Sequence, residues 1–118
     1  MLILDQTWVI AEGDQETVYV DFSDILSDGE SIASVATPEE QDTDDLTLAN
    51  ERANTAAYTD PHRLDANGDN IEVAIGKAVL FEISGQLDET GRYIIKVQIT
   101  TDATAPRTLV RGVPIEVA

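Results

Sequence analysis

The chain has 118 residues, of which 42% are hydrophobic, and its formal net charge is −16. This length is typical of one domain covering residues 1–118, and the apolar content is too high for a fully disordered protein. The chain has no cysteine, which excludes disulfides, cysteine-ligated zinc and thiol catalysis. An acidic surface repels phosphate backbones, so nucleic acid is not an expected partner.

The negative charge is concentrated in the first half of the chain. Residues 1–60 contain 15 acidic residues and one basic residue, whereas residues 61–118 contain 8 and 6. The apolar stretch from Met1 to Leu4 is followed directly by Asp5, so it lacks both the basic start and the length of an export signal. No apolar run is long enough to span a membrane. We therefore expect a soluble protein made without a signal peptide and without membrane contact.

The first half predicts short strands. Leu2 to Ile10 reads as a strand that is broken at Asp5-Gln6, and Thr17 to Phe22 alternates between apolar and polar residues. Ser31 to Ala36 is a further short strand, and Leu46 to Tyr58 is a poor strand rich in Ala, Asn and Thr. The acidic stretch from Ala36 to Asp45 predicts a surface loop, in which Thr37 to Glu40 has the pattern of a single helical turn.

The second half alternates more clearly. Apolar residues occupy odd positions from Ile71 to Ser84, which predicts either one long strand or a hairpin that turns at Gly76-Lys77. The stretch from Tyr93 to Thr100 places apolar residues at its odd positions and predicts a strand with one buried face. A last strand runs from Leu109 to Val117, where Pro114 predicts an edge or a bulge.

These spacings predict an all-β immunoglobulin-like β-sandwich of about seven strands with long acidic loops. The expected core consists of the apolar residues on the alternating faces. They are Val18, Val20, Ile32, Val79, Phe81, Ile83, Tyr93, Ile95, Val97 and Ile99.

We do not expect an enzyme. His62 is the only histidine, and its place between Pro61 and Arg63 is typical of an exposed turn residue. The glycines are isolated, so no phosphate-binding loop is present, and one Trp and three Tyr offer little to line a substrate cleft. No catalytic residue and no cofactor is therefore predicted.

One loop has part of a calcium-binding pattern. Asp65, Asn67 and Asp69 place oxygen ligands at the first, third and fifth positions of a calcium loop. The sixth position is Asn70 instead of Gly, and the twelfth is Gly76 instead of Glu, so the pattern fails where it is most specific. An Asn-Gly turn between two strands uses the same residues for backbone reasons. We expect the turn, and no divalent metal.

The stretch from Glu89 to Ile95 has the spacing of the tyrosine corner of immunoglobulin-like domains. Glu89 takes the place of the motif's Asp, Gly91 lies at the corner, and Tyr93 takes the place of the tyrosine that begins the buried face. In that motif the tyrosine hydroxyl bonds to backbone a few residues upstream. We expect the hydroxyl of Tyr93 to do so near Leu87 to Thr90. The alternative is a core tyrosine that follows an ordinary turn.

Three ordered stretches, which together span nearly the whole chain, have a recognisable pattern. They are Val20-Asp21-Phe22-Ser23-Asp24-Ile25-Leu26-Ser27-Asp28-Gly29-Glu30-Ser31-Ile32-Ala33-Ser34; Val79 to Gly85 followed by Gly91-Arg92-Tyr93; and Val97 to Thr101 followed by Arg107 or Arg111 and by Pro114 to Val117. In these stretches the chain resembles the small immunoglobulin-like virion structural proteins of tailed bacteriophages. The chain departs from the family at Val35-Ala36, where members often have Trp, and in the longer segment 37–69.

The resemblance implies a non-enzymatic protein of the phage virion, with the capsid surface as its location. We expect a capsid decoration (cement) protein that is made in the host cytoplasm and binds the major capsid protein as a homo-oligomer, with a trimer as one form. One alternative is a head–tail or tail-fibre adaptor. A second, from another class, is an extracellular adhesin or carbohydrate-binding β-sandwich module, for which only Trp8 suggests an aromatic surface.

Overall fold

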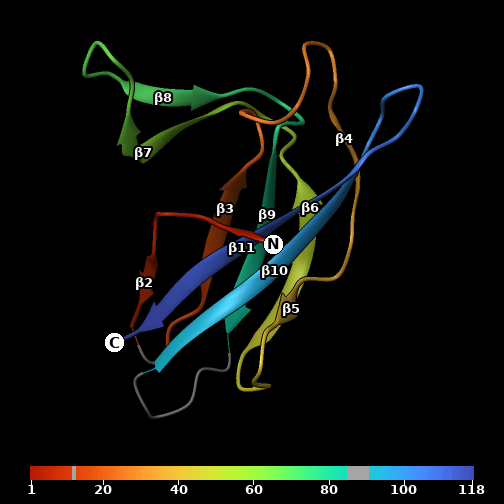
Figure 1. The fold of residues 1–118 in the computed structure, drawn as a ribbon. Helices are drawn as coiled ribbons and strands as arrows, with labels where there is room; N and C mark the ends of the chain where they lie inside the picture. Colours follow the sequence, from red (N-terminus) through yellow and green to blue (C-terminus); the bar gives the residue numbers. More distant parts are fainter. Residues whose placement is uncertain (12, 85–90) are drawn as a thin grey trace.

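A computed structural model describes residues 1–11, 13–84 and 91–118, and they form an all-β structure (Figure 1). In these ranges no helix is long and apolar enough to cross a membrane. The described residues contain eleven strands. They are β1 (Leu2–Ile3), β2 (Trp8–Ile10), β3 (Glu16–Asp21), β4 (Ile32–Val35), β5 (Glu39–Glu40), β6 (Thr47–Ala53), β7 (Tyr58–Leu64), β8 (Asn70–Val73), β9 (Ala78–Ser84), β10 (Gly91–Thr101) and β11 (Thr108–Val117).

The strands form two main sheets and a separate hairpin. The larger sheet has the order β1-β11-β10-β4, with β2 also paired to β11 and β5 to β10. The smaller sheet has the order β3-β9-β6, and β7 and β8 form a two-stranded sheet. Figure 1 shows β10 and β11 running diagonally across β3, β9 and β6, as in two layers that cover a common core.

The core lies between the two main sheets. Buried residues alternate with partly exposed ones along β10, because successive side chains of a strand point to opposite faces. Every residue of the expected core is buried, which confirms that part of the sequence prediction. The structure adds further buried side chains from β2, from the residue after β3, from the residue before β6, and from β11. They are Ile10, Phe22, Leu46, Val113, Ile115 and Val117.

The N-terminal strand is divided opposite Pro114, which confirms the break predicted near Asp5. Both pieces pair parallel to β11, with Ile3 opposite Gly112 and Trp8 opposite Ile115. The N–H of Leu4 donates to the carbonyl of Gly112 at 2.8 Å, so Gly112 faces the N-terminal strand. Backbone groups alternate in direction along a strand, so Pro114 faces the same side and has no N–H to donate there. A continuous edge strand would lack a hydrogen bond at that position. Pro114 therefore lies within a strand paired on both sides, opposite a gap in one neighbour.

The segment from Ile71 to Ser84 is neither one strand nor a hairpin. It divides at residues 74–77 into β8 and β9, which belong to different sheets and do not pair with each other. The buried side chain of Asn54 fixes this division. Its Oδ1 accepts from the N–H groups of Lys77 and Ala78, both at 3.0 Å, and its Nδ2 donates to the carbonyl of Ala74 at 2.8 Å. The predicted turn at Gly76 is present, but the predicted partner strand is not.

The predicted helical turn at Thr37 to Glu40 is wrong. Glu39 and Glu40 form β5, opposite Lys96 and Ile95 of β10. The carboxylate of Glu40 accepts from the N–H of Leu46 at 2.7 Å, so it closes the acidic loop instead of capping a helix. Propensity favoured the helix, but the pairing of two residues with a long central strand determines the structure.

Buried Glu30 connects two loops at one end of the sheets. Its carboxylate accepts from Nε of Arg107 at 3.1 Å and from the N–H of Ser27 at 2.9 Å, and Arg107 also donates to the carbonyl of Ile25 at 2.8 Å. These hydrogen bonds, led by that of Arg107, lower the pKa of Glu30 to about 2. The connection from β3 to β4 is therefore held against the connection from β10 to β11.

Candidate functional site

Three aromatic rings from distant parts of the sequence meet at one edge of the fold. Tyr19 lies between buried Val18 and Val20 in β3, so its side chain points away from the core. Its ring centroid is 6.4 Å from that of Trp8, and the two ring planes differ by only 14°. The centroid of Tyr58, the first residue of β7, is 4.7 Å from that of Tyr19. Together these side chains form a continuous aromatic surface.

An ion-pair cluster lies beside the rings. The register of β7 against β8 shifts between Thr59 and Leu64, so the intervening residues form a bulge that includes Pro61. The bulge directs Arg63 toward the end of β3, where its Nη2 is 2.7 Å from Oδ2 of Asp21. Nε of Arg63 is 2.6 Å from Oδ2 of Asp60. Two carboxylates are thus held in fixed orientations by one guanidinium group.

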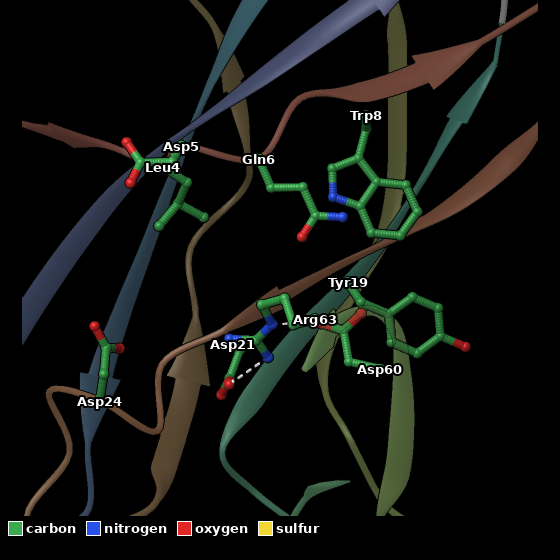
Figure 2. Close-up of a pocket in the computed structure, with 9 residues that line it drawn as sticks. All are labelled: Leu4, Asp5, Gln6, Trp8, Tyr19, Asp21, Asp24, Asp60 and Arg63. Atoms are coloured by element: carbon green, nitrogen blue, oxygen red, sulfur yellow. Dashed lines mark hydrogen bonds and ion pairs between the residues drawn. The ribbon is translucent and has the colours of Figure 1, made fainter. Parts of the chain in front are cut away.

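Two adjoining hollows cover this region, and we call them together the aromatic groove. The first has a volume of about 450 Å³ and the second about 300 Å³, and both are lined by Trp8, Tyr19 and Asp60. Figure 2 shows that the segment from Leu4 to Trp8 provides one rim of the first hollow, while Asp24, Asp21 and Arg63 lie opposite. The gap opposite Pro114 therefore supplies one rim of the groove.

The ionisation states in the groove follow from these contacts. Burial disfavours the charge on Arg63, but hydrogen bonds and charge interactions with Asp21 and Asp60 outweigh it, so the pKa of Arg63 is above its ordinary value. Burial, assisted by the same carboxylates, also raises the pKa of Tyr58. At neutral pH the groove therefore contains a charged Arg63 and an uncharged Tyr58 hydroxyl.

The predicted calcium candidates lie in the turn that joins β7 and β8. Oδ1 of Asp65 accepts from the N–H of Asn67 at 2.8 Å and from that of Asp69 at 3.1 Å, and Gly68 has a φ of +84°. The Asp65 carboxylate thus satisfies backbone donors of the turn, as an Asx turn requires. No group of three or more His, Asp or Glu that could hold a metal is present among the described residues.

The predicted corner is described only in part, because Glu89 and the expected acceptors from Leu87 to Thr90 lie outside the described residues. Tyr93 is buried in the core, as expected. A Cβ atom added at Gly91 would lie 3.0 Å from the hydroxyl oxygen of Tyr93, so the tyrosine ring packs closely over this glycine. The Tyr93 hydroxyl donates to Oδ2 of Asp45 at 3.4 Å.

Sequence reasoning did not find the aromatic groove. The sequence suggests Trp8 as a surface aromatic residue but does not connect it with Tyr19 or Tyr58. The available signal was the outward position of Tyr19 in an alternating strand, since a large aromatic side chain on the polar face of a strand needs a neighbour. The prediction that His62 lies in a turn is wrong, because the residue belongs to β7.

Neither a scan against protein-family models nor searches of curated proteins and of solved structures finds a match.

Proposed function

We propose that this chain is a non-enzymatic structural protein of a tailed-phage virion, and specifically a capsid decoration protein with an immunoglobulin-like fold. The observation that supports the fold is the strand order. The sheet with the order β3-β9-β6 faces the sheet with the order β11-β10-β4. These orders correspond to the B-E-D and G-F-C strands of an immunoglobulin-like sandwich. In this assignment β1 and β2 form a divided first strand that pairs with the last one.

The stretches that resemble the phage family lie in both main sheets. The first runs from the end of β3 into β4, the second covers most of β9 and the start of β10, and the third covers the second half of β10 and the end of β11. The longer segment 37–69 contains β5, β6 and β7, and the β7–β8 hairpin is an addition between the D-like and E-like strands. The departure from the family in length thus coincides with an added hairpin and leaves the central strand order unaffected.

The proposed partner is the major capsid protein on the outer surface of the head. A decoration protein needs a rigid scaffold and exposed loops for contact, and sheets that share one buried core supply the scaffold. A net charge of −16 keeps many copies apart before assembly. Copies that gather around local symmetry axes of the shell would form a homo-oligomer, with a trimer as one form.

Virion composition tests this proposal. We expect purified particles of the phage that encodes the chain to contain it in numbers comparable to the major capsid protein, and a density map to place it on the outer face of the head. A few copies at the head–tail joint or the fibres would instead indicate an adaptor. Absence from the particle, with secretion of the chain, would favour the adhesin class. Either result would overturn the decoration proposal.

Salt distinguishes how the chain docks. Attachment through the acidic residues 1–60 to basic residues of the shell should weaken when heads that carry the protein are moved from low to high ionic strength, because exposed charges are screened. Attachment through an apolar surface should not weaken. A pelleting assay at two salt concentrations measures this, with retention of the major capsid protein as the control.

A further inference from the structure

We propose that the aromatic groove binds a neutral saccharide chain. This inference goes beyond the proposed virion role and does not depend on it, because it follows from the groove alone. The groove combines the three rings of Trp8, Tyr19 and Tyr58 with the Asp21–Arg63–Asp60 cluster. A sugar-binding site requires two kinds of group, aromatic faces and oriented planar polar groups.

The aromatic part matches the apolar face of a sugar. A pyranose ring has a face of C–H groups and a rim of hydroxyls, so it packs with its C–H groups against an aromatic ring. Trp8 and Tyr19 are within 14° of parallel, with centroids 6.4 Å apart. Neighbouring rings in nearly one orientation can support consecutive units of a chain. Tyr19, with 36% of its surface exposed, is open to such a contact.

The polar part matches the hydroxyl rim. The guanidinium of Arg63 orients the carboxylates of Asp21 and Asp60, so these acceptors are fixed before a ligand arrives. About a third of the Arg63 side chain is exposed (34%), which leaves this donor group accessible at the groove. Tyr58 keeps its proton because its pKa is raised, so it remains a neutral hydroxyl. Such a set can donate to and accept from adjacent sugar hydroxyls.

Charge and ring geometry restrict the ligand class. The first hollow is lined by Asp5, Asp21, Asp24 and Asp60 against the single cation Arg63, so uronates and other anionic sugars are repelled. Organic cations would seek both the aromatic faces and the carboxylates. However, Arg63 already pairs with both Asp21 and Asp60. Trp8 and Tyr19 are nearly parallel, so of the three rings just Tyr58, tilted by 56° from Tyr19, offers a second side to a cation. A neutral saccharide fits both features.

The dimensions favour an oligosaccharide over a single sugar. The two hollows, of about 450 and 300 Å³, adjoin at Trp8, Tyr19 and Asp60, which line both. Each is within the size range of small-molecule sites. A chain that extends across both would contact Trp8 and Tyr19 with consecutive units and Tyr58 with a further unit in the second hollow.

Intrinsic fluorescence provides a direct test, because Trp8 is the only tryptophan in the chain. The full chain is titrated with neutral hexasaccharides of glucose, mannose and xylose, with oligogalacturonate as an anionic probe, and with chitosan oligomers and spermidine as cationic probes. We expect at least one neutral oligosaccharide to change the Trp8 emission with saturation, and the anionic probe to have no effect. Isothermal calorimetry with that oligosaccharide gives the Kd.

Variants locate the binding. Tyr19→Ala should raise the Kd about tenfold through the lost stacking surface, and Arg63→Gln should also raise it because the carboxylates lose their orientation. Trp8 packs partly against the core, so Trp8→Phe is used to keep the fold, with calorimetry as the readout. Val9→Ala is the matched control, since Val9 is an exposed neighbour of Trp8 that does not line the groove.

Three results would overturn the proposal. They are no response to any neutral oligosaccharide up to about 10 mM, binding that Tyr19→Ala and Arg63→Gln leave unchanged while both variants are folded by circular dichroism, and a response to spermidine alone. None of these results bears on the virion role, which is measured on particles. Conversely, a chain absent from virions can still bind the saccharide.

Discussion

Glu30 is one of the few charged residues that the fold buries, with 5% of its surface exposed. Its pKa, lowered from 4.5 to about 2, means that the folded state holds the carboxylate in its ionised form more strongly than the unfolded chain does. A lowered pKa of this kind stabilises the fold fully above the unfolded value. The stabilisation is lost as pH falls from about 4.5 through about 2.

We therefore predict a pH-dependent difference between the wild type and Glu30→Gln. The melting temperature of the variant should be lower at neutral pH, because Arg107 and Ser27 lose a charged acceptor. The difference should shrink as pH falls below about 4.5 and nearly vanish near 2. Thermal denaturation across this range measures it. Glu39→Gln, a change on an exposed side chain, should show no such trend, and a constant difference for Glu30→Gln would contradict the role of ionisation.

A second prediction at the scale of single residues concerns Phe81 in the core. It is fully buried in β9 opposite Val18, so Phe81→Ala leaves a cavity between the two main sheets. We predict a loss of about 3–5 kcal/mol in the free energy of unfolding, measured by chemical denaturation. The adjacent Leu80 lies on the other face of β9 and is only partly buried, so Leu80→Ala should cost less. Equal costs would mean that the core is not where the alternation places it.

At the scale of elements, substitutions of Asp65 in the turn of the β7–β8 hairpin can distinguish a backbone role of this residue from a metal-binding role. Asp65→Ala removes the acceptor of two N–H groups and should destabilise the hairpin by about 1 kcal/mol, whereas Asp65→Asn keeps an acceptor and should cost less. Excess Ca²⁺ should raise the melting temperature no more than Mg²⁺ does. A calcium-specific increase that Asp65→Ala abolishes would identify a metal site instead.

The strands differ in how well the sequence predicts them, and the reason is physical. β10 alternates over its whole length because one face is buried by the smaller sheet, and such a pattern can be read directly. Ile75 has the same parity as Val73 and Val79 but is 60% exposed, because the turn fixed by Asn54 interrupts the strand. The side chain of buried Asn54 bonds backbone groups that strand pairing would otherwise bond, and such an interaction leaves no periodic pattern in the sequence. Two-residue β5 is determined by its partner β10 and not by its own residues.

At the scale of the whole molecule, the core could be predicted whereas the aromatic groove could not. The core depends on local alternation, which each strand carries within itself. The groove depends on Trp8, Tyr19 and Tyr58, which belong to β2, β3 and β7 and come together only when the sheets and the hairpin are assembled. The bulge that brings Arg63 to Asp21 is likewise a property of the β7–β8 register, which the sequence of β7 alone does not determine.

Pro114 has a consequence for how this chain can diversify. Pairing with β11 stops after Leu4 and resumes at Trp8, so residues 5–7 are held at both ends but are not part of the ladder. A segment of this kind can change its side chains without disturbing the sheet, because no strand register depends on them. Asp5 and Gln6 line the first hollow of the groove. Mutations at these two positions would alter what the groove recognises at little cost in stability. Because of the gap opposite Pro114, the binding surface can therefore evolve independently of the fold.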